Sequence, residues 1–238
     1  MKRIFISDLH LEDHQAPAFL RFKECLEKES RTVDEIYILG DLVEMWIGDD
    51  DDSVMAEKLR CVMTSSATNC KLFILHGNRD FLFGQQFCHA ASAQLLSDPH
   101  LTSDGLLLSH GDVLCTDDEA YQAMRKLLRS ETWQADILSK SLAERKLFGQ
   151  GLREQSKNSN ANKSTNIMDV NAGAVEILLQ EHNSRVLIHG HTHRPGVHVE
   201  DNYTRIVTGA WEKCGWLCRQ VGDELKLECF SLARRYGT

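Results

Sequence analysis

The sequence lacks the patterns that would place the chain across a membrane or in a disulfide scaffold. It has no run of about 18 apolar residues, so no segment is predicted to span a membrane. The amino terminus also lacks the long apolar stretch of a signal peptide, because Asp8 interrupts it, and we therefore expect a cytoplasmic protein. Eight cysteines are present, but none forms a Cys-x-x-Cys pair, and their positions in apolar segments predict buried free thiols.

An excess of positive charge is also missing. The 238 residues include 27 Lys and Arg against 35 Asp and Glu, which gives a net charge of −8. A general nucleic-acid binder has a basic surface, so we expect no nucleic-acid partner. The chain is 42% hydrophobic and 26% charged, a composition that excludes the disordered and fibrous classes and is sufficient for a buried core.

Short apolar runs alternate with helical patterns along most of the chain. Five of these runs are predicted to be buried strands, at residues 3–7, 35–39, 71–76, 106–109 and 185–189. A helix is expected to begin at Pro17, since Phe19, Phe22 and Leu26 recur at helical spacing. The alternation predicts an α/β fold with parallel pairing in at least part of the sheet. Strands alone are expected at 205–208, 216–221 and 224–230, which predicts a second, more antiparallel sheet.

Residues 120–168 differ from the rest of the chain in charge. This segment has nine Lys and Arg against four Asp and Glu, a net charge of +5, so the remainder has −13. Its helical pattern also contains large apolar residues, namely Trp133, Ile137, Leu138, Leu142, Leu147 and Phe148. The composition favours a solvated helical hairpin packed on the core, and a lid over an anionic, partly apolar ligand is the alternative.

Each of the five predicted strands is followed by candidate metal ligands. They are Asp8 and His10, then Asp41, then Asn78 and Asp80, then His110 and Asp112, and finally His189, His191 and His193. The carboxyl ends of strands in an α/β sheet meet at one edge, so we expect these side chains to converge. Mixed Asp, His and Asn ligation favours Mn²⁺, Fe²⁺ or Zn²⁺, and the set is large enough for two ions that share a carboxylate.

The order of these motifs resembles that of the calcineurin-like metallophosphoesterases. The motifs are Asp-x-His, Gly-Asp, Gly-Asn-x-Asp, His-Gly-Asp and Gly-His-x-His, and they span nearly the whole chain. The resemblance implies a two-sheet sandwich flanked by helices and two divalent ions, expected to be Mn²⁺. It assigns Asp8, His10 and His191 to one ion, Asn78, His110 and His189 to the other, and Asp41 to a bridge between them.

Longer stretches are similar to the UDP-2,3-diacylglucosamine hydrolases of lipid A biosynthesis. They include Ser7-Asp8-Leu9-His10-Leu11, Trp46-Ile47-Gly48-Asp49-Asp50-Asp51, His76-Gly77-Asn78-Arg79-Asp80-Phe81-Leu82 and the stretch from Ile188 to Pro195. The similarity implies a core of residues 1–119 and 169–238 with an inserted helical cap, residues 120–168. It thereby favours the lid over the solvated hairpin.

This resemblance also implies a reaction and a place for it. Water would attack the α-phosphorus of UDP-2,3-diacylglucosamine, giving UMP and 2,3-diacylglucosamine 1-phosphate. The lipid substrate implies peripheral contact with anionic lipid at the cytoplasmic face of the inner membrane, for which the basic, partly apolar cap is suited. No obligate protein partner is inferred.

Arg79 stands where many metallophosphoesterases have a histidine. Arginine does not donate a proton at neutral pH, but it binds phosphate oxygens with two parallel hydrogen bonds. A leaving phosphate monoester has a second pKa of about 6 and departs without protonation, so Arg79 is expected to be catalytic and to bind substrate. The resemblance implies further substrate contacts by Asn78, Asp118, Ser156, Asn160, Lys163 and His189. The large apolar cap residues are candidate walls for acyl chains, although packing between helices explains them equally well.

Two other functions are compatible with the same ligands. One is a dinuclear-metal phosphodiesterase or phosphatase that acts on a soluble phosphoester, against which Arg79 and the cap argue. The other is a binding module without activity, which would be expected to lose ligands, whereas all seven positions are filled here.

Overall fold

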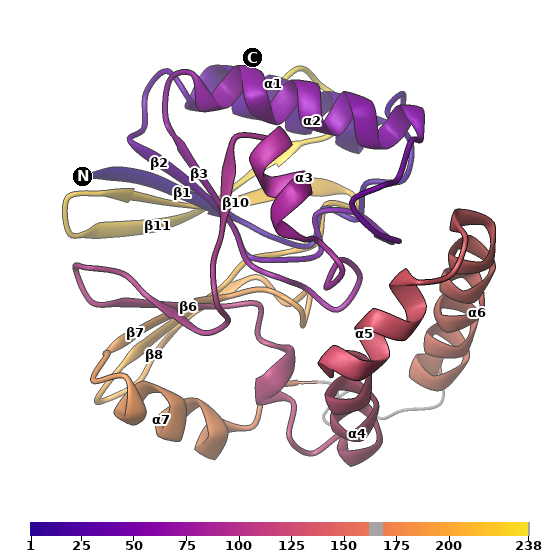
Figure 1. Ribbon diagram of the computed structural model, residues 1–238. Helices are drawn as coiled ribbons and strands as arrows, with labels where there is room; N and C mark the ends of the chain where they lie inside the picture. Colours follow the sequence, from indigo (N-terminus) through magenta and orange to yellow (C-terminus); the bar gives the residue numbers. More distant parts are fainter. Residues whose placement is uncertain (162–168, 238) are drawn as a thin grey trace.

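The computed structural model describes residues 1–161 and 169–237, which form two β-sheets packed face to face (Figure 1). In spatial order, the first sheet contains β11 (Glu224–Ser231), β10 (Cys214–Val221), β1 (Lys2–Ile6), β2 (Glu35–Ile38), β3 (Lys71–Ile74) and β4 (Ala93–Leu95). The second contains β5 (His100–Leu101), β6 (Leu106–Ser109), β7 (Val186–His189), β9 (Thr204–Val207) and β8 (Gly196–Val199). All five strands predicted to precede candidate ligands are present, as β1, β2, β3, β6 and β7.

A second sheet is present, as predicted, but the strands predicted at 205–208, 216–221 and 224–230 do not lie in it together. Strand β9 pairs in parallel with β7 in the second sheet, whereas β10 pairs antiparallel with β1 and extends the first sheet. The second sheet therefore has a parallel centre with antiparallel edges, whereas the first is antiparallel only on the side of β10 and β11. The physical reason is that the hairpin of β10 and β11 completes the edge of β1, a pairing between residues more than 200 positions apart, as in Arg3 and Gln220.

Alternation of side chains along the strands places apolar residues on both faces of the sheets, which gives three layers of core. Ile4 and Ile6 of β1 pack toward the helices, and Phe5 between them packs against the second sheet. Helices α1 (Pro17–Glu29), α2 (Val54–Ala67) and α3 (Gln85–Ala90) cover the outer face of the first sheet (Figure 1). Helix α7 (Ala172–Glu181) covers the second sheet through Val175 and Leu179. The expected apolar face of α1 is confirmed, because Phe19, Phe22 and Leu26 are buried.

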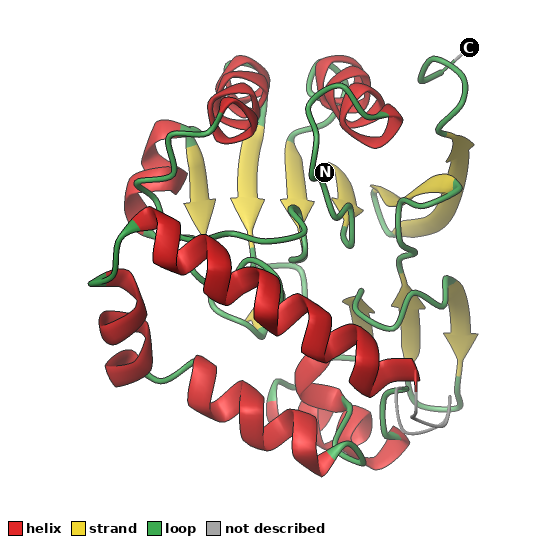
Figure 2. Ribbon diagram, turned by 90° about the vertical axis from the view of Figure 1, so that its right-hand side faces the viewer, coloured by secondary structure: helices red, strands yellow, loops and turns green. Residues whose placement is uncertain are grey.

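Three further helices stand to one side of the sandwich. They are α4 (Glu119–Leu128), α5 (Glu131–Leu138) and α6 (Leu142–Ala161), which follow the short 3₁₀ helix η1 (Asp112–Leu114). Figure 2 shows them in front of the sheets, on the side where the strands of the first sheet end. Asp118 begins α4 by accepting a hydrogen bond from the Tyr121 amide at 3.1 Å, which is a usual N-cap arrangement.

The eight cysteines are free thiols, as predicted, but not all are buried. Cys61 and Cys229 are exposed, because they lie on the solvent faces of α2 and β11, while Cys25, Cys70 and Cys88 are among the buried ones. Among the helices of the described residues, none combines the length and the apolar character that crossing a membrane requires.

Candidate metal centre

The loops after β1, β2 and β6 bring two carboxylates and an imidazole together in the interior. Asp8, Asp41 and His110 are each at most 2% exposed, and their ligand atoms all lie within 4.8 Å of one another. Asp8 also forms a second such group with His10 and His193. Carboxylate oxygens and imidazole nitrogens are ligands that divalent transition metals accept, so this donor set fits the expected ions.

Asn78 connects this group to the loop after β7. Its Oδ1 atom lies 2.9 Å from His110 Nε2 and 2.8 Å from His191 Nδ1. The His191 amide donates a hydrogen bond to Asp8 Oδ2 at 3.0 Å. Six of the seven predicted ligands are therefore brought together, from five separate loops.

His189 and His193 occupy positions that the sequence did not predict. His189 is fully buried, with Nδ1 2.9 Å from the Gly190 carbonyl oxygen and Nε2 3.2 Å from Arg205 Nη1, so its assignment as a ligand stays a prediction. His193 Nε2 lies 3.5 Å from Asp8 Oδ1 and 3.2 Å from His10 Nε2. His193 thus contacts the Asp8 group, although the resemblance assigned it to neither ion.

The backbone at the site is held in an uncommon conformation. Asp8, His10, Asp41, His191 and His193 have positive φ angles between 48° and 67°, and they are five of the seven non-glycine residues with positive φ in the described part of the chain. Such residues cost free energy and persist only where the surroundings fix them. The sequence gives no direct signal for this feature.

Asp80 is one of the groups that fix these loops. Its buried carboxylate accepts hydrogen bonds from the amides of Gly77 and Leu42, both at 2.7 Å, and of Asp41 at 3.3 Å. It therefore ties the loop of Asn78 to the loop of Asp41 without belonging to either ligand group. Burial raises the pKa of Asp80 to about 6, and the nearby charge of Asp41 adds to the effect. The position of Asp80, three residues after Gly77, could have indicated from the sequence that its carboxylate holds this loop.

The imidazoles of the site fall into two groups, those whose pKa is lowered and those whose pKa is raised. Burial lowers the pKa of His189 to about 3 and that of His191 to about 4, so both are neutral at pH 7, the form that binds metal. For His10 the same burial is outweighed by Glu44, Asp41 and Asp8, which raise its pKa to about 9. His110 is shifted in the same direction as His10, because several carboxylates, Asp41 first, outweigh its burial and raise its pKa.

A cavity of about 310 Å³ opens beside these ligands. It is lined by His10, Asp41, Asn78, Arg79, Cys115, Asp118, Tyr121, His191, Thr192, His193 and Arg194. Arg79 and Asp118, both predicted to contact substrate, therefore border the same space as the candidate ligands. Tyr121 and Arg194 were not predicted. The side chains of Ser156 and Asn160, and all of Lys163, lie outside the described residues.

Helix α4 is tied to the edge of the site through Asp112. Asp112 Oδ2 accepts a hydrogen bond from the Tyr121 hydroxyl at 2.9 Å and one from Arg125 Nε at 2.7 Å. Arg129 Nη2 lies 3.4 Å from the same oxygen. Asp112, a candidate ligand at the end of a strand, therefore anchors α4 in this structure.

The apolar residues of the three helices differ in burial. Ile137 is 3% exposed, which is typical of packing, whereas Leu138, Leu147 and Phe148 are exposed. Trp133 lies between Phe148 and Phe81 of the core, with ring centroids 5.6 and 6.0 Å away.

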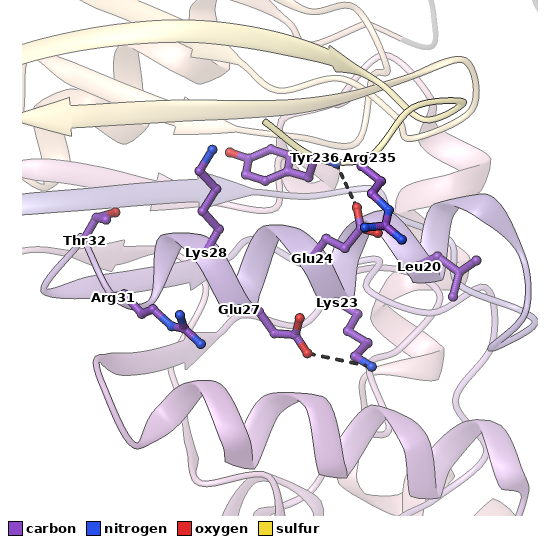
Figure 3. Close-up of a pocket in the computed structure, with 9 residues that line it drawn as sticks. All are labelled: Leu20, Lys23, Glu24, Glu27, Lys28, Arg31, Thr32, Arg235 and Tyr236. Atoms are coloured by element: carbon purple, nitrogen blue, oxygen red, sulfur yellow. Dashed lines mark hydrogen bonds and ion pairs between the residues drawn. The ribbon is translucent and has the colours of Figure 1, made fainter. Parts of the chain in front are cut away.

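A further cavity, of about 670 Å³, lies along α1 and the C-terminal segment (Figure 3). Its charged groups face one another, as Lys23 and Glu27 do at 3.8 Å, and Glu24 accepts a hydrogen bond from the Tyr236 amide at 2.8 Å. These contacts hold the C-terminal segment against α1. The cavity shares no lining residue with the candidate metal centre.

Comparison with known proteins shows the family of the chain. The chain is 48% identical over 203 residues to a UDP-2,3-diacylglucosamine hydrolase of Aromatoleum aromaticum, which covers 84% of this chain and 83% of the relative. It is 40% identical over 238 residues to one of Escherichia coli, covering 95% and 98%. A solved archaeal phosphodiesterase is 13% identical with a TM-score of 0.50, covers 97% of this chain and 100% of its own, and shares the fold alone. The sequence model of the calcineurin-like phosphoesterases matches residues 1–195. The chain therefore belongs to the calcineurin-like phosphoesterase family and, within it, to the family of these hydrolase relatives.

Proposed function

We propose that this protein hydrolyses the pyrophosphate bond of UDP-2,3-diacylglucosamine to UMP and 2,3-diacylglucosamine 1-phosphate, a step of lipid A biosynthesis. The observation that carries this proposal is identity of 48% and 41% over 84% and 94% of the chain to hydrolases named for this substrate. The cavity at the candidate ligands supports it, because an anionic group placed there would meet both the metal centre and Arg79. No observation favours a soluble phosphoester.

We propose that Asp8, His10, Asp41, Asn78, His110, His189 and His191 would hold two divalent ions, Mn²⁺ in each case, and that Asp41 would serve both. Ions of this kind activate water and neutralise charge on phosphate oxygens when they are bound. The protein contributes the rigid donor set, because buried loops with positive φ cannot rearrange freely.

Arg79 is proposed to bind the diphosphate and to stabilise the leaving phosphate group. Its amide donates a hydrogen bond to Asp41 Oδ1 at 2.8 Å, so its backbone is fixed to the proposed bridging ligand. The guanidinium cannot supply a proton at neutral pH, and the leaving phosphate monoester does not require one. The side chain therefore acts by charge and by directed hydrogen bonds.

Asn78, Asp118, Ser156, Asn160, Lys163 and His189 are proposed to share substrate binding with Arg79. Asp118 can accept a hydrogen bond from a hydroxyl or amide of the sugar, while Lys163 supplies positive charge for phosphate. We further propose that residues 1–119 and 169–238 form the catalytic core and that residues 120–168 form a cap. Trp133, which packs on Phe148 and on Phe81, is with Phe148 a candidate wall for the acyl chains.

We also propose peripheral contact with anionic lipid at the cytoplasmic face of the inner membrane. Among the described side chains of α4, α5 and α6, five large apolar ones are exposed, namely Met124, Leu127, Leu138, Leu147 and Phe148. They accompany the basic residues of the segment, and such a surface binds anionic membranes. Co-sedimentation with vesicles of phosphatidylglycerol at low salt is expected, and failure to sediment would reject this part of the proposal.

Turnover on three substrates tests the proposed reaction. The protein with Mn²⁺ should release UMP from UDP-2,3-diacylglucosamine and leave a cyclic nucleotide and a phosphopeptide essentially intact. Asp41→Ala should lose both bound metal and activity, because it removes the proposed bridging ligand. Faster turnover of either soluble ester would reject the proposed substrate, and an active Asp41→Ala variant would reject the proposed site.

A further inference from the structure

The imidazole ring of His10 points one nitrogen toward the candidate metal centre and the other toward a carboxylate outside it. His10 Nε2 lies 3.8 Å from Asp41 Oδ2, on the side of the ligand group. His10 Nδ1 lies 2.9 Å from Glu44 Oε2. The two ring nitrogens therefore face different partners, and Glu44 lies at ion-pair distance from the nitrogen on the far side of the ring, the side from which a carboxylate can orient a metal-bound histidine.

The backbone holds His10 and Glu44 side by side. Beyond the ends of β1 and β2, the Leu11 amide bonds to the Leu42 carbonyl at 3.1 Å, and the Glu44 amide bonds to the Leu11 carbonyl at 3.2 Å. Leu11 and Val43 form an isolated parallel bridge there. The placement of Glu44 is thus a product of the fold rather than of one mobile side chain.

The other oxygen of Glu44 contacts a helix from a distant part of the sequence. Glu44 Oε1 lies 2.8 Å from Nε of Arg153, which belongs to α6. Arg153 also forms an ion pair with Glu12, so its guanidinium lies between two acidic side chains of the core. A continuous chain of contacts therefore runs from α6 through Arg153 and Glu44 to His10.

We propose that Glu44 is a positioning residue for His10 and that Arg153 sets the position of Glu44, so that docking of α6 and metal binding favour each other. A metal ion would fix the orientation of the His10 ring, and the ring would then fix the side chain of Glu44. Glu44 is one of the two carboxylates, with Glu12, that form ion pairs with Arg153. By thermodynamic reciprocity, α6 in its docked position then raises the affinity for metal by the same factor. This inference rests on the proposed role of His10 as a ligand, but it does not depend on the identity of the substrate.

The sign of one effect separates this coupling from simple electrostatics. Arg153 is a cation near the metal centre, so if charge alone mattered, neutralising it in Arg153→Gln would tighten Mn²⁺ binding. If Arg153 positions Glu44, the same substitution weakens Mn²⁺ binding. Arg153→Lys, which keeps the charge but loses the planar fork, should fall between Arg153→Gln and the wild-type protein.

Calorimetric titration of the metal-free full chain with Mn²⁺ alone tests the proposal. Glu44→Gln should bind Mn²⁺ about 10-fold more weakly than wild type, and Arg153→Gln several-fold more weakly. Glu12→Gln is the matched control, because it removes the other carboxylate beside Arg153 and leaves Glu44 and His10 in place, so its Mn²⁺ affinity should fall less than that of Arg153→Gln. Hydrogen exchange of residues 142–154 should slow on addition of Mn²⁺ in the wild-type protein and much less in Glu44→Gln.

Each alternative outcome has a definite meaning. Wild-type affinity in Glu44→Gln, or tighter binding in Arg153→Gln, would overturn the inference and leave the proposed function untouched. Arg153 lies on a partly exposed helix, so Arg153→Gln supplies the test even if Glu44→Gln does not fold. A wild-type protein that binds no Mn²⁺ would overturn the proposed metal centre and this inference together.

Discussion

Asp80 and Leu42 are joined across two loops, because Asp80 Oδ2 accepts a hydrogen bond from the Leu42 amide at 2.7 Å. The same buried carboxylate also accepts from Gly77 and Asp41, and so it holds the loops that carry Asn78 and Asp41. Replacement by alanine leaves these buried amides without their acceptor.

We therefore expect Asp80→Ala to lower the free energy of unfolding of the metal-free protein by about 3 kcal/mol. Its Mn²⁺ affinity should fall as well, because Asp41 and Asn78 lose their shared support. Urea denaturation and metal titration measure the two effects. Asp34→Ala removes an exposed carboxylate that accepts one bond from the Lys2 amide, and it should cost less than about 1 kcal/mol. Equal losses in the two variants would contradict the role given to Asp80.

Substitution of the Arg79 side chain should affect catalysis without affecting metal binding. Its contact with Asp41 is made by the backbone amide, which side-chain substitution leaves in place. We expect Arg79→Gln to lower kcat by about 10²- to 10³-fold while the Kd for Mn²⁺ changes little. Arg79→Lys should recover part of the loss, because it retains the charge. Steady-state kinetics beside metal titration measure both quantities, and an Arg79→Gln variant with nearly wild-type kcat would show that the guanidinium has no catalytic role.

Metal binding should release protons at pH 7. The pKa of His10 is about 9 in the metal-free protein, so its ring is protonated there and must lose a proton to bind metal, whereas His189 and His191, at about 3 and 4, are already neutral. Mn²⁺ affinity should therefore rise with pH up to about 9. Titration calorimetry in buffers of different ionisation enthalpy counts the protons, and we expect at least about one per protein. A heat independent of the buffer would contradict the charge state of His10.

The raised pKa of His10 also makes the free energy of unfolding of the metal-free protein depend on pH, and stability should fall where Mn²⁺ affinity rises. The folded pKa of His10, about 9, lies above the ordinary value of 6.5, so protonated His10 stabilises the fold fully below pH 6.5. This contribution is lost as the pH rises through 9. Urea denaturation from pH 6 to pH 10 without metal should show the decline, and it should be smaller in His10→Gln.

Arg3, near the start of β1, connects the two sheets through ion pairs. It is 2% exposed, with Nε 2.7 Å from Glu35 Oε2 and Nη1 2.6 Å from Asp104 Oδ1. Asp104 lies between β5 and β6 of the second sheet. Arg3→Met would leave the buried Glu35 without this partner, and we expect a loss of about 3 kcal/mol in urea denaturation. Lys71→Met, which removes an exposed partner of Glu35 at 3.8 Å, should cost less than about 0.5 kcal/mol, and similar costs for both would reject this role of Arg3.

The strands that carry the site could be predicted from the sequence, but the way other strands pair with them at the edges of the sheets could not. The apolar runs at β1, β2, β3, β6 and β7 and the polar residues after them are local patterns, so both could be predicted. The pairing of β10 with β1 joins distant parts of the chain, and no local pattern specifies it. The edge strands β4 and β5 have only three and two residues, too few for a periodic signal.

Within the site, residue types were predictable and their arrangement was not. Asp8, Asp41 and His110 were identified from their motifs, but the positive φ of Asp8 and Asp41 depends on the surrounding bonds. Glu44 had no motif of its own, because its significance follows from the orientation of the His10 ring. The motif of Asp112 made it a candidate metal ligand, but its carboxylate instead forms ion pairs with Arg125 and Arg129.

Hydrolysis of UDP-2,3-diacylglucosamine by the Mn²⁺-loaded protein in ¹⁸O-water tests the central claim most directly. Attack of water on the α-phosphorus, with the lipid phosphate as leaving group beside Arg79, places the label in UMP, and mass spectrometry of the two products locates it. We predict label in UMP and none in 2,3-diacylglucosamine 1-phosphate. Label in the lipid phosphate, or no turnover at all, would contradict this account.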